Sequence, residues 1–224
     1  MASYPALAQA VSQLCERPPW CVTGVSGLVY DDAGLWFELG KPKNWVTRDD
    51  GVIEIGLGAI GGSLEPGESL WDCWRREMRE EIGDVPEPTA AQQTLIVYEE
   101  RIIYPTRTND PLPSPVLLTV SANRHRRATL AGCETLAIVT FWGHARRRPQ
   151  RGDLFGLLHL PYVALPSTLM QPQLTVGQLL EIPALVLELG GQLPEPAIIK
   201  PMWTVRSLQL ALQQGALSFQ PPAR

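Results

Sequence analysis

The sequence predicts an α/β (α+β) fold in which a mixed β-sheet carries packed helices. Two observations lead to this prediction. Apolar runs of strand length recur along the chain, and one stretch without Gly or Pro, Ser69–Ile82, has helical spacing. The chain has 224 residues, 45% of them hydrophobic and 19% charged, which suits a soluble, globular protein of one large domain or of one domain with an appended piece. Its net charge of −4 disfavours a general nucleic-acid binder.

Residues 1–15 are expected to form a short helix, and the polar segment Lys41–Gly51 is expected to be a loop. The strands are recognised by apolar runs that end at turn residues such as Asp31–Gly34. In chain order, they are expected at residues 22–30, 35–39, 52–57, 94–104, 115–121, 136–142 and 154–160.

The last part of the chain is expected to hold two helices, Gln173–Gly191 and Pro201–Leu217, the first kinked at Pro183. We therefore expect residues 1–170 to form the main domain, with a short N-terminal helix. Residues 171–224 would be a C-terminal helical extension packed on the same domain. A substrate lid or a dimer contact is the alternative use of these helices, and a homodimer is possible.

The four cysteines, Cys15, Cys21, Cys73 and Cys133, show no CxxC spacing. We expect isolated reduced thiols, as in a cytoplasmic protein, in preference to a disulfide framework. The N-terminus is too polar for a signal peptide. The uncharged stretch Leu154–Leu180 is interrupted by prolines, so no transmembrane segment is expected.

The stretch Ser69–Ile82 predicts an amphipathic helix. Ser69 suits the N-cap position, with Asp72 three residues later, where a carboxylate favours the helix N-terminus. One buried stripe is expected from the apolar residues at every fourth position, Leu70, Trp74, Met78 and Ile82.

Three carboxylates, Glu77, Glu80 and Glu81, stand at i, i+3 and i+4, so they share one turn of this helix. Crowded carboxylates repel each other, and hard oxygen ligands of this kind are what Mg²⁺ or Mn²⁺ requires. A solvated acidic helix face is the alternative interpretation.

The wider segment Gly62–Asp84, GSLEPGESLWDCWRREMREEIGD, resembles the Nudix box, G-x5-E-x7-R-E-U-x-E-E-x-G-U with U apolar. Asp84 departs from the last apolar position, where a late helix end could let Val85 take the packing role. The invariant positions that match are Gly62, Glu68, Arg76, Glu77, Glu80, Glu81 and Gly83.

The resemblance implies an α/β/α sandwich and the Mg²⁺-dependent (or Mn²⁺-dependent) hydrolysis of a nucleoside diphosphate linked to another group, X. It implies that Glu77, Glu80 and Glu81 are catalytic metal ligands, joined by the backbone carbonyl of Gly61. Arg76 would pair with Glu68 and fix the joint between loop and helix.

The general base varies within the family and is often in the loop before the last strand, here Arg146–Asp153. Asp153 is therefore the candidate catalytic base, although a simple turn residue is an equally good interpretation. Glu99, Glu100 and Glu134 are alternatives, as is a water activated by the metal alone.

Gly56, Gly58 and Gly61 also match G-x-G-x-x-G, but no helix is expected to begin there, which disfavours a nicotinamide-dependent oxidoreductase. The other alternative is a catalytically silent Nudix-fold module that senses a nucleotide or serves as a scaffold. The expected partner is a small nucleotide-type substrate.

Two basic clusters are interpreted as solvated loops or as a positive rim that steers a phosphorylated substrate. They are Arg124–Arg127 with His125, and Arg146–Arg148 with Arg151. Four tryptophans could stack a base, although core packing is the commoner fate: Trp36, Trp45, Trp142 and Trp203.

Overall fold

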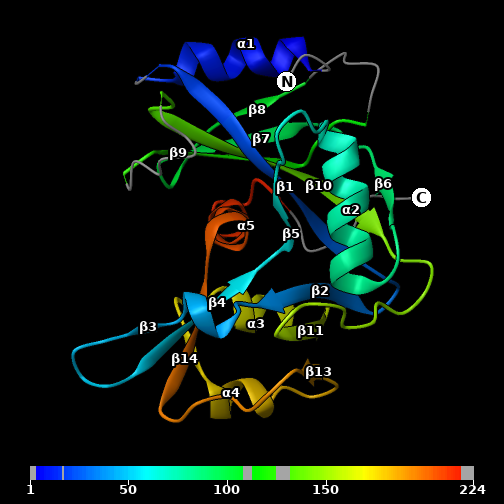
Figure 1. Ribbon diagram of the computed structural model, residues 1–224, viewed down its shortest axis with the longest axis vertical. Helices are drawn as coiled ribbons and strands as arrows, with labels where there is room; N and C mark the ends of the chain where they lie inside the picture. Colours follow the sequence, from blue (N-terminus) through cyan, green and yellow to red (C-terminus); the bar gives the residue numbers. More distant parts are fainter. Residues whose placement is uncertain (1–3, 17, 108–112, 125–131, 218–224) are drawn as a thin grey trace.

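The computed structural model describes residues 4–16, 18–107, 113–124 and 132–217 (Figure 1). The helices are α1 (Pro5–Leu14), α2 (Leu70–Ile82), α3 (Leu165–Leu169), α4 (Val176–Leu180) and α5 (Trp203–Gln213), with a short 3-10 helix η1 (Pro42–Asn44). The first strands are β1 (Trp20–Tyr30), β2 (Gly34–Leu39), β3 (Val46–Thr47), β4 (Ile53–Gly58), β5 (Ile60–Ser63), β6 (Glu87–Thr89) and β7 (Thr94–Tyr98). They are followed by β8 (Arg101–Thr106), β9 (Leu117–Ala122), β10 (Thr135–His144), β11 (Gly156–Pro161), β12 (Leu174–Thr175), β13 (Val186–Leu189) and β14 (Ala197–Pro201).

The sheet is mixed, as the sequence predicts. Its main path runs β12-β14-β4-β2-β1-β10-β9-β7-β8, with β11 beside β2 and β5 beside β1. The pairs β1–β10, β4–β14 and β7–β9 are parallel, and β1 is antiparallel to β2 and β5. Parallel neighbours come from distant parts of the chain, because a parallel pair needs a long crossover connection.

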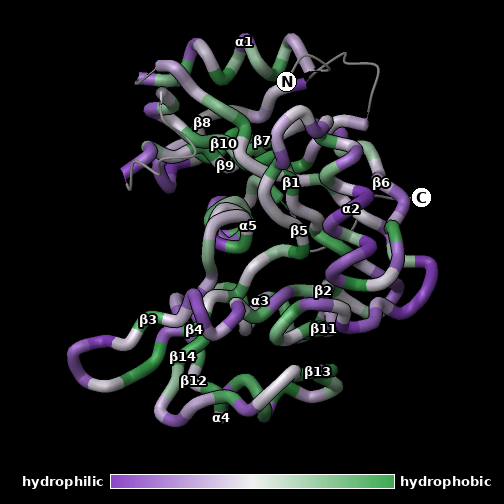
Figure 2. Tube along the Cα trace, viewed as in Figure 1, coloured by the Kyte–Doolittle hydropathy of each residue, from purple (hydrophilic) through white to green (hydrophobic). Residues whose placement is uncertain are grey.

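Alternation along β1 divides the interior into two cores, one on each face of the sheet. Val25 and Val29 pack with residues of α1 and α2, whereas Leu28 and Tyr30 belong to the core that α5 covers. Successive side chains of a strand point to opposite faces, so helices cover both sides of β1. The α/β/α sandwich that the box resemblance implies is confirmed. Figure 2 shows green, hydrophobic strands inside and a purple, hydrophilic loop between β3 and β4.

The prediction of the first C-terminal helix is wrong for most of its length. Within Gln173–Gly191 only α4 is helical, where Thr175 and Gln178 form a capping box. Pro183 follows the helix, and Val186–Leu189 then pairs with β11 as strand β13. Hydrogen bonding to the edge of β11 has thus outweighed a weak helical pattern in this segment.

The second expected helix is confirmed as α5, but it begins at Trp203. Pro201 instead ends β14, which lies parallel to β4 in the register Ala197↔Ile53. The segment after residue 171 therefore contributes strands to the sheet as well as helices. The division of the chain at residue 170 stays a prediction.

The expectation of four reduced thiols is wrong for two of them. Cys21 and Cys133 form a disulfide with a Cα–Cα distance of 5.8 Å, across 112 residues of sequence. The parallel pairing of β1 with β10 sets Trp20 opposite Thr135 and so brings Cys133 to the start of β1. Cys15 and Cys73 lie outside this bond.

Within the described residues, every helix is too short or too polar to span a membrane.

Candidate active site

Helix α2 forms where its pattern predicts, with a capping residue at each end. The Ser69 hydroxyl accepts a hydrogen bond from the Asp72 N–H over 3.1 Å, and Gly83 closes the helix with φ 70°, a left-handed conformation that glycine adopts without a Cβ penalty. All four residues of the apolar stripe are buried, from Leu70 at 8% exposure to Met78 at 0%.

The helix ends at Ile82 and not later, so the irregular box position is accommodated in another way. Asp84 accepts the Val85 N–H on its carboxylate over 2.8 Å. Val85 is half-buried and packs against the core that holds Met78 and Ile82. Val85 therefore takes the apolar role without any extension of the helix.

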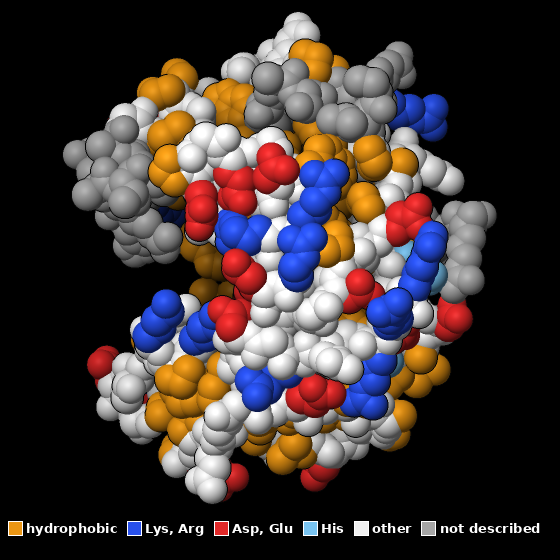
Figure 3. Space-filling view, turned by 45° about the vertical axis from the view of Figure 1, so that its right-hand side comes forward, with side chains coloured by type: hydrophobic (Ala, Val, Ile, Leu, Met, Phe, Trp, Pro, Cys, Tyr) orange, Lys and Arg blue, Asp and Glu red, His pale blue; other side chains and the backbone are white. Residues whose placement is uncertain are grey.

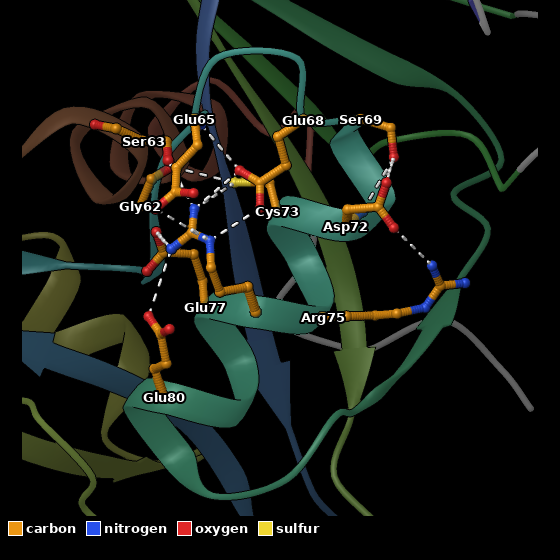
Figure 4. Close-up of polar contacts among 11 residues, drawn as sticks. Gly62, Ser63, Glu65, Glu68, Ser69, Asp72, Cys73, Arg75, Glu77 and Glu80 are labelled. Carbon is orange, nitrogen blue, oxygen red and sulfur yellow. Dashed lines mark hydrogen bonds and ion pairs between the residues drawn. The ribbon is translucent and has the colours of Figure 1, made fainter.

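Arg76 joins the loop before α2 to the helix through Ser63 and Glu68, which are labelled in Figure 4. Its guanidinium makes two parallel bonds to the Glu68 carboxylate, each 2.9 Å, and a third donor reaches the Ser63 carbonyl over 3.0 Å. These bonds from Arg76 hold the pKa of Glu68 at about 2. The pairing that the resemblance implies is confirmed, and a bidentate pair of this kind fixes geometry as well as charge.

The three glutamates of the box do not point the same way. Glu77 and Glu81 are buried, at 8% and 6% exposure, whereas Glu80 is exposed. Glu77 also accepts from Arg76 over 2.7 Å, and Glu81 accepts the backbone N–H of Gly61 over 2.7 Å. The helical spacing thus places all three glutamates within one turn, but only Glu77 and Glu81 of the three are buried.

The glycines before the helix allow this approach. A Cβ on Gly62 would lie 2.3 Å from Oε1 of Glu77, and a Cβ on Gly61 would lie 2.3 Å from the Val25 carbonyl oxygen. Gly61 also has φ 143°, a conformation that side chains rarely adopt. Without side chains, Gly61 can pack directly against β1 and Gly62 directly against the Glu77 carboxylate.

Two residues that the sequence analysis missed complete the cluster. Glu38 of β2 lies opposite Gly58 of β4, and Lys41 follows three residues later and binds the Asp153 carboxylate over 2.9 Å. The sequence signal that could have found Glu38 is its position as the one acid in the otherwise apolar strand β2.

The carboxylates of this cluster interact electrostatically. Burial raises the pKa of Glu81, and the charge of Glu38 raises it further. Burial also raises the pKa values of Glu38 and Glu77, although Lys41 opposes the shift at Glu38 and Arg76 opposes it at Glu77. The positive charges of Lys41 and Arg76 therefore do not offset the burial and mutual repulsion of these carboxylates.

Asp153 reaches this cluster because its loop caps the C-terminus of α2. The N–H groups of Gln150, Gly152 and Asp153 donate to the carbonyls of Ile82 (3.1 Å), Glu81 (2.8 Å) and Glu80 (3.1 Å) respectively. These are the carbonyls that the end of a helix leaves without partners. Gly152 is required, since a Cβ there would lie 2.0 Å from the Glu80 oxygen.

The alternative bases lie elsewhere. Glu99 pairs with Arg124 and Glu100 with Arg206, and both acids line a second cavity. The Glu134 backbone is bound to Pro19 at the start of β1.

A cavity of about 750 Å³ opens beside the cluster, and its walls include Glu38, Gly61, Gly62, Glu68 and Trp203. Figure 3 shows a face hollowed at its left edge, with apolar side chains in the recess. This volume lies in the range of small-molecule sites.

No three side chains of His, Cys, Asp or Glu form a ready-made metal site in the parts of the chain that the structure describes. Mg²⁺ does not need one, because it usually keeps several waters and binds one or two protein carboxylates together with substrate phosphates. The hard, undercompensated carboxylates of Glu77 and Glu81 fit that requirement.

The remaining candidates are distributed as follows. Gly56 and Gly58 lie within β4 and Gly61 within β5, and the next helix begins only at Leu70, so the dinucleotide interpretation fails. Trp36 and Trp142 are buried, and Trp45 packs against Phe155.

The basic clusters do not form a common rim. Arg146 pairs with Glu87 and Arg148 with Glu188, and Arg151 donates to the Leu154 carbonyl. None of these three arginines is among the described residues that line the cavity. Arg124 does line it, while residues 125–127 lie outside the described part of the chain.

Residues 24–131 match the model of the NUDIX domain. The chain contains a Nudix domain. The match begins within β1, extends past β9 and includes the whole box, but ends before Asp153 and α5.

Among solved structures, the chain is similar to the MutT protein of Bacillus halodurans, at 16% identity over 64% of this chain and 71% of that one, with a TM-score of 0.31. It is similar to a NUDIX hydrolase from Nitrosomonas europaea, at 18% identity over 66% and 77%, with a TM-score of 0.40. The MutT NUDIX hydrolase of Burkholderia pseudomallei is 13% identical over 86% and 97%, with a TM-score of 0.33. No curated protein matches the chain.

Proposed function

We propose that this protein hydrolyses a nucleoside diphosphate linked to another group, X, in a reaction that depends on Mg²⁺ or Mn²⁺. One observation carries the proposal. The buried carboxylates of Glu77 and Glu81 lie against the backbone of Gly61 and Gly62, beside a cavity large enough for a nucleotide. The Nudix domain supports the same reaction class.

Glu77 and Glu81 would hold the metal, with Glu80 at the exposed edge and the carbonyl of Gly61 as a further oxygen donor. When bound, Mg²⁺ supplies positive charge that neutralises the diphosphate oxygens and makes water more acidic. Glu77 must then exchange part of its contact with Arg76, 2.7 Å away, for the cation. Arg76 keeps its two parallel hydrogen bonds to Glu68 and so holds the loop in place.

In the reaction, a water oxygen attacks one phosphorus, the bridging P–O bond breaks, and the leaving phosphate keeps the electron pair. A base must take the proton of the water. Asp153 is our candidate because its loop is bound to the last turn of α2, which also carries Glu80 and Glu81. Lys41 donates a hydrogen bond to the Asp153 carboxylate over 2.9 Å and so orients it.

The second candidate function is a nucleotide sensor or scaffold without turnover. The retention of every box acid, with Glu77 and Glu81 turned inward, favours the enzyme. A homodimer and a cytoplasmic location stay predictions.

The test is a phosphate-release screen with Mg²⁺ over nucleoside diphosphate sugars, dinucleotides, CoA and nucleoside triphosphates. We expect one class to be hydrolysed by the wild type, and turnover to be lost in Glu81→Gln. Glu181→Gln, an exposed glutamate at the end of α4, is the matched control and should keep full activity. Full activity in Glu81→Gln would overturn the proposal. Ligand binding without turnover across the panel would favour the sensor.

A further inference from the structure

Trp203 differs from the buried tryptophans in its exposure and in its backbone. Its side chain is 47% exposed, whereas Trp36, Trp74 and Trp142 are at most 6% exposed. Its φ is 44°, in the left-handed region that a bulky side chain rarely occupies. Such conformations persist only where the surroundings enforce them, and they gather at ligand sites.

The neighbours of Trp203 supply that enforcement. The N–H of Met202 donates to the Leu57 carbonyl over 3.0 Å, which ties the start of α5 to β4. On the other side, the hydroxyl of Thr204 lies 2.9 Å from that of Ser26. The two attachments fix the chain on both sides of Trp203, so the indole is presented by a rigid element.

The same attachments set the indole close to the box glycines. Ser26 of β1 is paired with Gly61 of β5, and Gly61 binds Glu81. Trp203 therefore adjoins Thr204, whose hydroxyl contacts Ser26, and Ser26 lies opposite Gly61 in the sheet. Trp203, Gly61 and Gly62 all line the same cavity.

The lining of the cavity leaves room for a flat aromatic ligand beside the indole. Its lining residues on β1 and β9 include four small ones: Gly24, Ser26, Thr119 and Ser121. Asn123 and Arg124 add polar atoms at the rim, where the edge of a base could be bound. Indole faces stack on nucleobases with little dependence on the base.

We propose that Trp203 stacks on the nucleobase of the substrate and selects base-bearing diphosphates over base-free ones. This inference rests on the proposed function for the identity of the site, because the diphosphate would lie at Gly61 and Gly62. Trp203 is thus a specificity-determining residue from outside the matched Nudix segment.

A binding experiment tests stacking without turnover. The probe is 2-aminopurine riboside 5′-diphosphate with Mg²⁺, since stacking quenches the fluorescence of this base. We expect the wild type to quench it, Trp203→Leu to lose the quenching and bind about tenfold more weakly, and Trp203→Phe to keep most of both. Trp20→Leu is the matched control, because that half-buried indole donates to Ser12 and lies outside the cavity. Unchanged quenching in Trp203→Leu would overturn the inference.

Inorganic pyrophosphate separates this inference from a general defect. It lacks a base, so Trp203→Leu should bind it as the wild type does, whereas Glu81→Gln should bind it more weakly. An equal loss of pyrophosphate and probe binding in Trp203→Leu would show a merely structural role and overturn the inference. A wild type that quenches the probe through Trp203 but hydrolyses nothing would count against the proposed function alone.

Discussion

The carboxylate of Glu81 accepts the backbone N–H of Gly61 over 2.7 Å, which joins the last turn of α2 to strand β5, 20 residues earlier in the chain. The electrostatic neighbours of this carboxylate include three acids, Glu38, Glu77 and Asp153, and the ammonium of Lys41. Burial and the neighbouring Glu38 raise the pKa of Glu81, so the folded protein tolerates the charge at a cost.

Glu81→Gln should therefore leave the metal-free fold as stable as the wild type or slightly more stable, because the amide oxygen can still accept from Gly61. Mg²⁺ at about 100 times its dissociation constant should stabilise the wild type by about 2.7 kcal/mol, and the variant by much less. Thermal unfolding with Mg²⁺ and with EDTA measures both effects, with Glu181→Gln as the control. A large loss of stability in EDTA would contradict this account of the charge.

Gly62→Ala should displace the carboxylate of Glu77, since the new Cβ would lie 2.3 Å from its Oε1. We expect a loss of about 1–3 kcal/mol in stability from the overpacking, and a much larger loss of turnover. Gly177→Ala is the control, because its Cβ would meet nothing closer than 3.8 Å. Urea unfolding and phosphate release separate the two effects. Normal turnover in Gly62→Ala would mean that Glu77 does not need its observed position.

Asp31 provides a prediction about pH that is independent of the candidate active site. Burial alone would raise its pKa, but hydrogen bonds from His159, the Ala33 N–H and Trp36 outweigh it and hold the pKa well below its usual range. A depressed folded pKa stabilises the protein above the unfolded value, about 3.9, and this stabilisation is lost as the pH falls further.

Asp31→Asn should accordingly cost about 1–3 kcal/mol at pH 6, because a half-buried acceptor of several donors is weakened. The difference between wild type and variant should shrink below about pH 4. Urea unfolding from pH 6 to pH 2 measures it. A difference that stays constant over this range would show that the Asp31 charge contributes nothing.

Asp153→Asn should lower kcat by about 100-fold or more if this residue takes the proton of the attacking water, with a smaller change in KM. The fold should persist, because the Asp153 N–H that caps α2 is retained. Glu181→Gln, an exposed glutamate that lines neither cavity, is the control. An unchanged kcat would move the role to another group, with Glu38 as the first residue to replace.

Reduction of the Cys21–Cys133 disulfide should destabilise the fold by about 2–4 kcal/mol, because the bond closes a long loop in the unfolded chain. The paired variant Cys21→Ser with Cys133→Ser should show the same loss and no further response to dithiothreitol. Thermal unfolding with and without dithiothreitol is the measurement. An identical melting temperature in both conditions would contradict a structural role for this bond.

Local features were predictable because their causes lie within a few residues. The caps and the buried stripe fixed α2 at its observed bounds, and the box spacing anticipated the pairing of Arg76 with Glu68. The wrong prediction of a long helix at Gln173–Gly191 also has a local cause, because the apolar residues there fit both the helical and the strand period. Pairing with β11 made part of this region a strand.

By itself, the sequence determined the mixed α/β class, helix α2 and the presence of a Nudix box, because periodicity and spacing express local geometry. Only the tertiary structure decided that Glu38, Lys41 and Asp153 join the box acids, that Cys21 meets Cys133, and that Trp203 faces the cavity. Each of these relationships depends on which strands and loops become neighbours. Neighbours separated by a hundred residues are chosen by the burial of both sheet faces together, which no local pattern records.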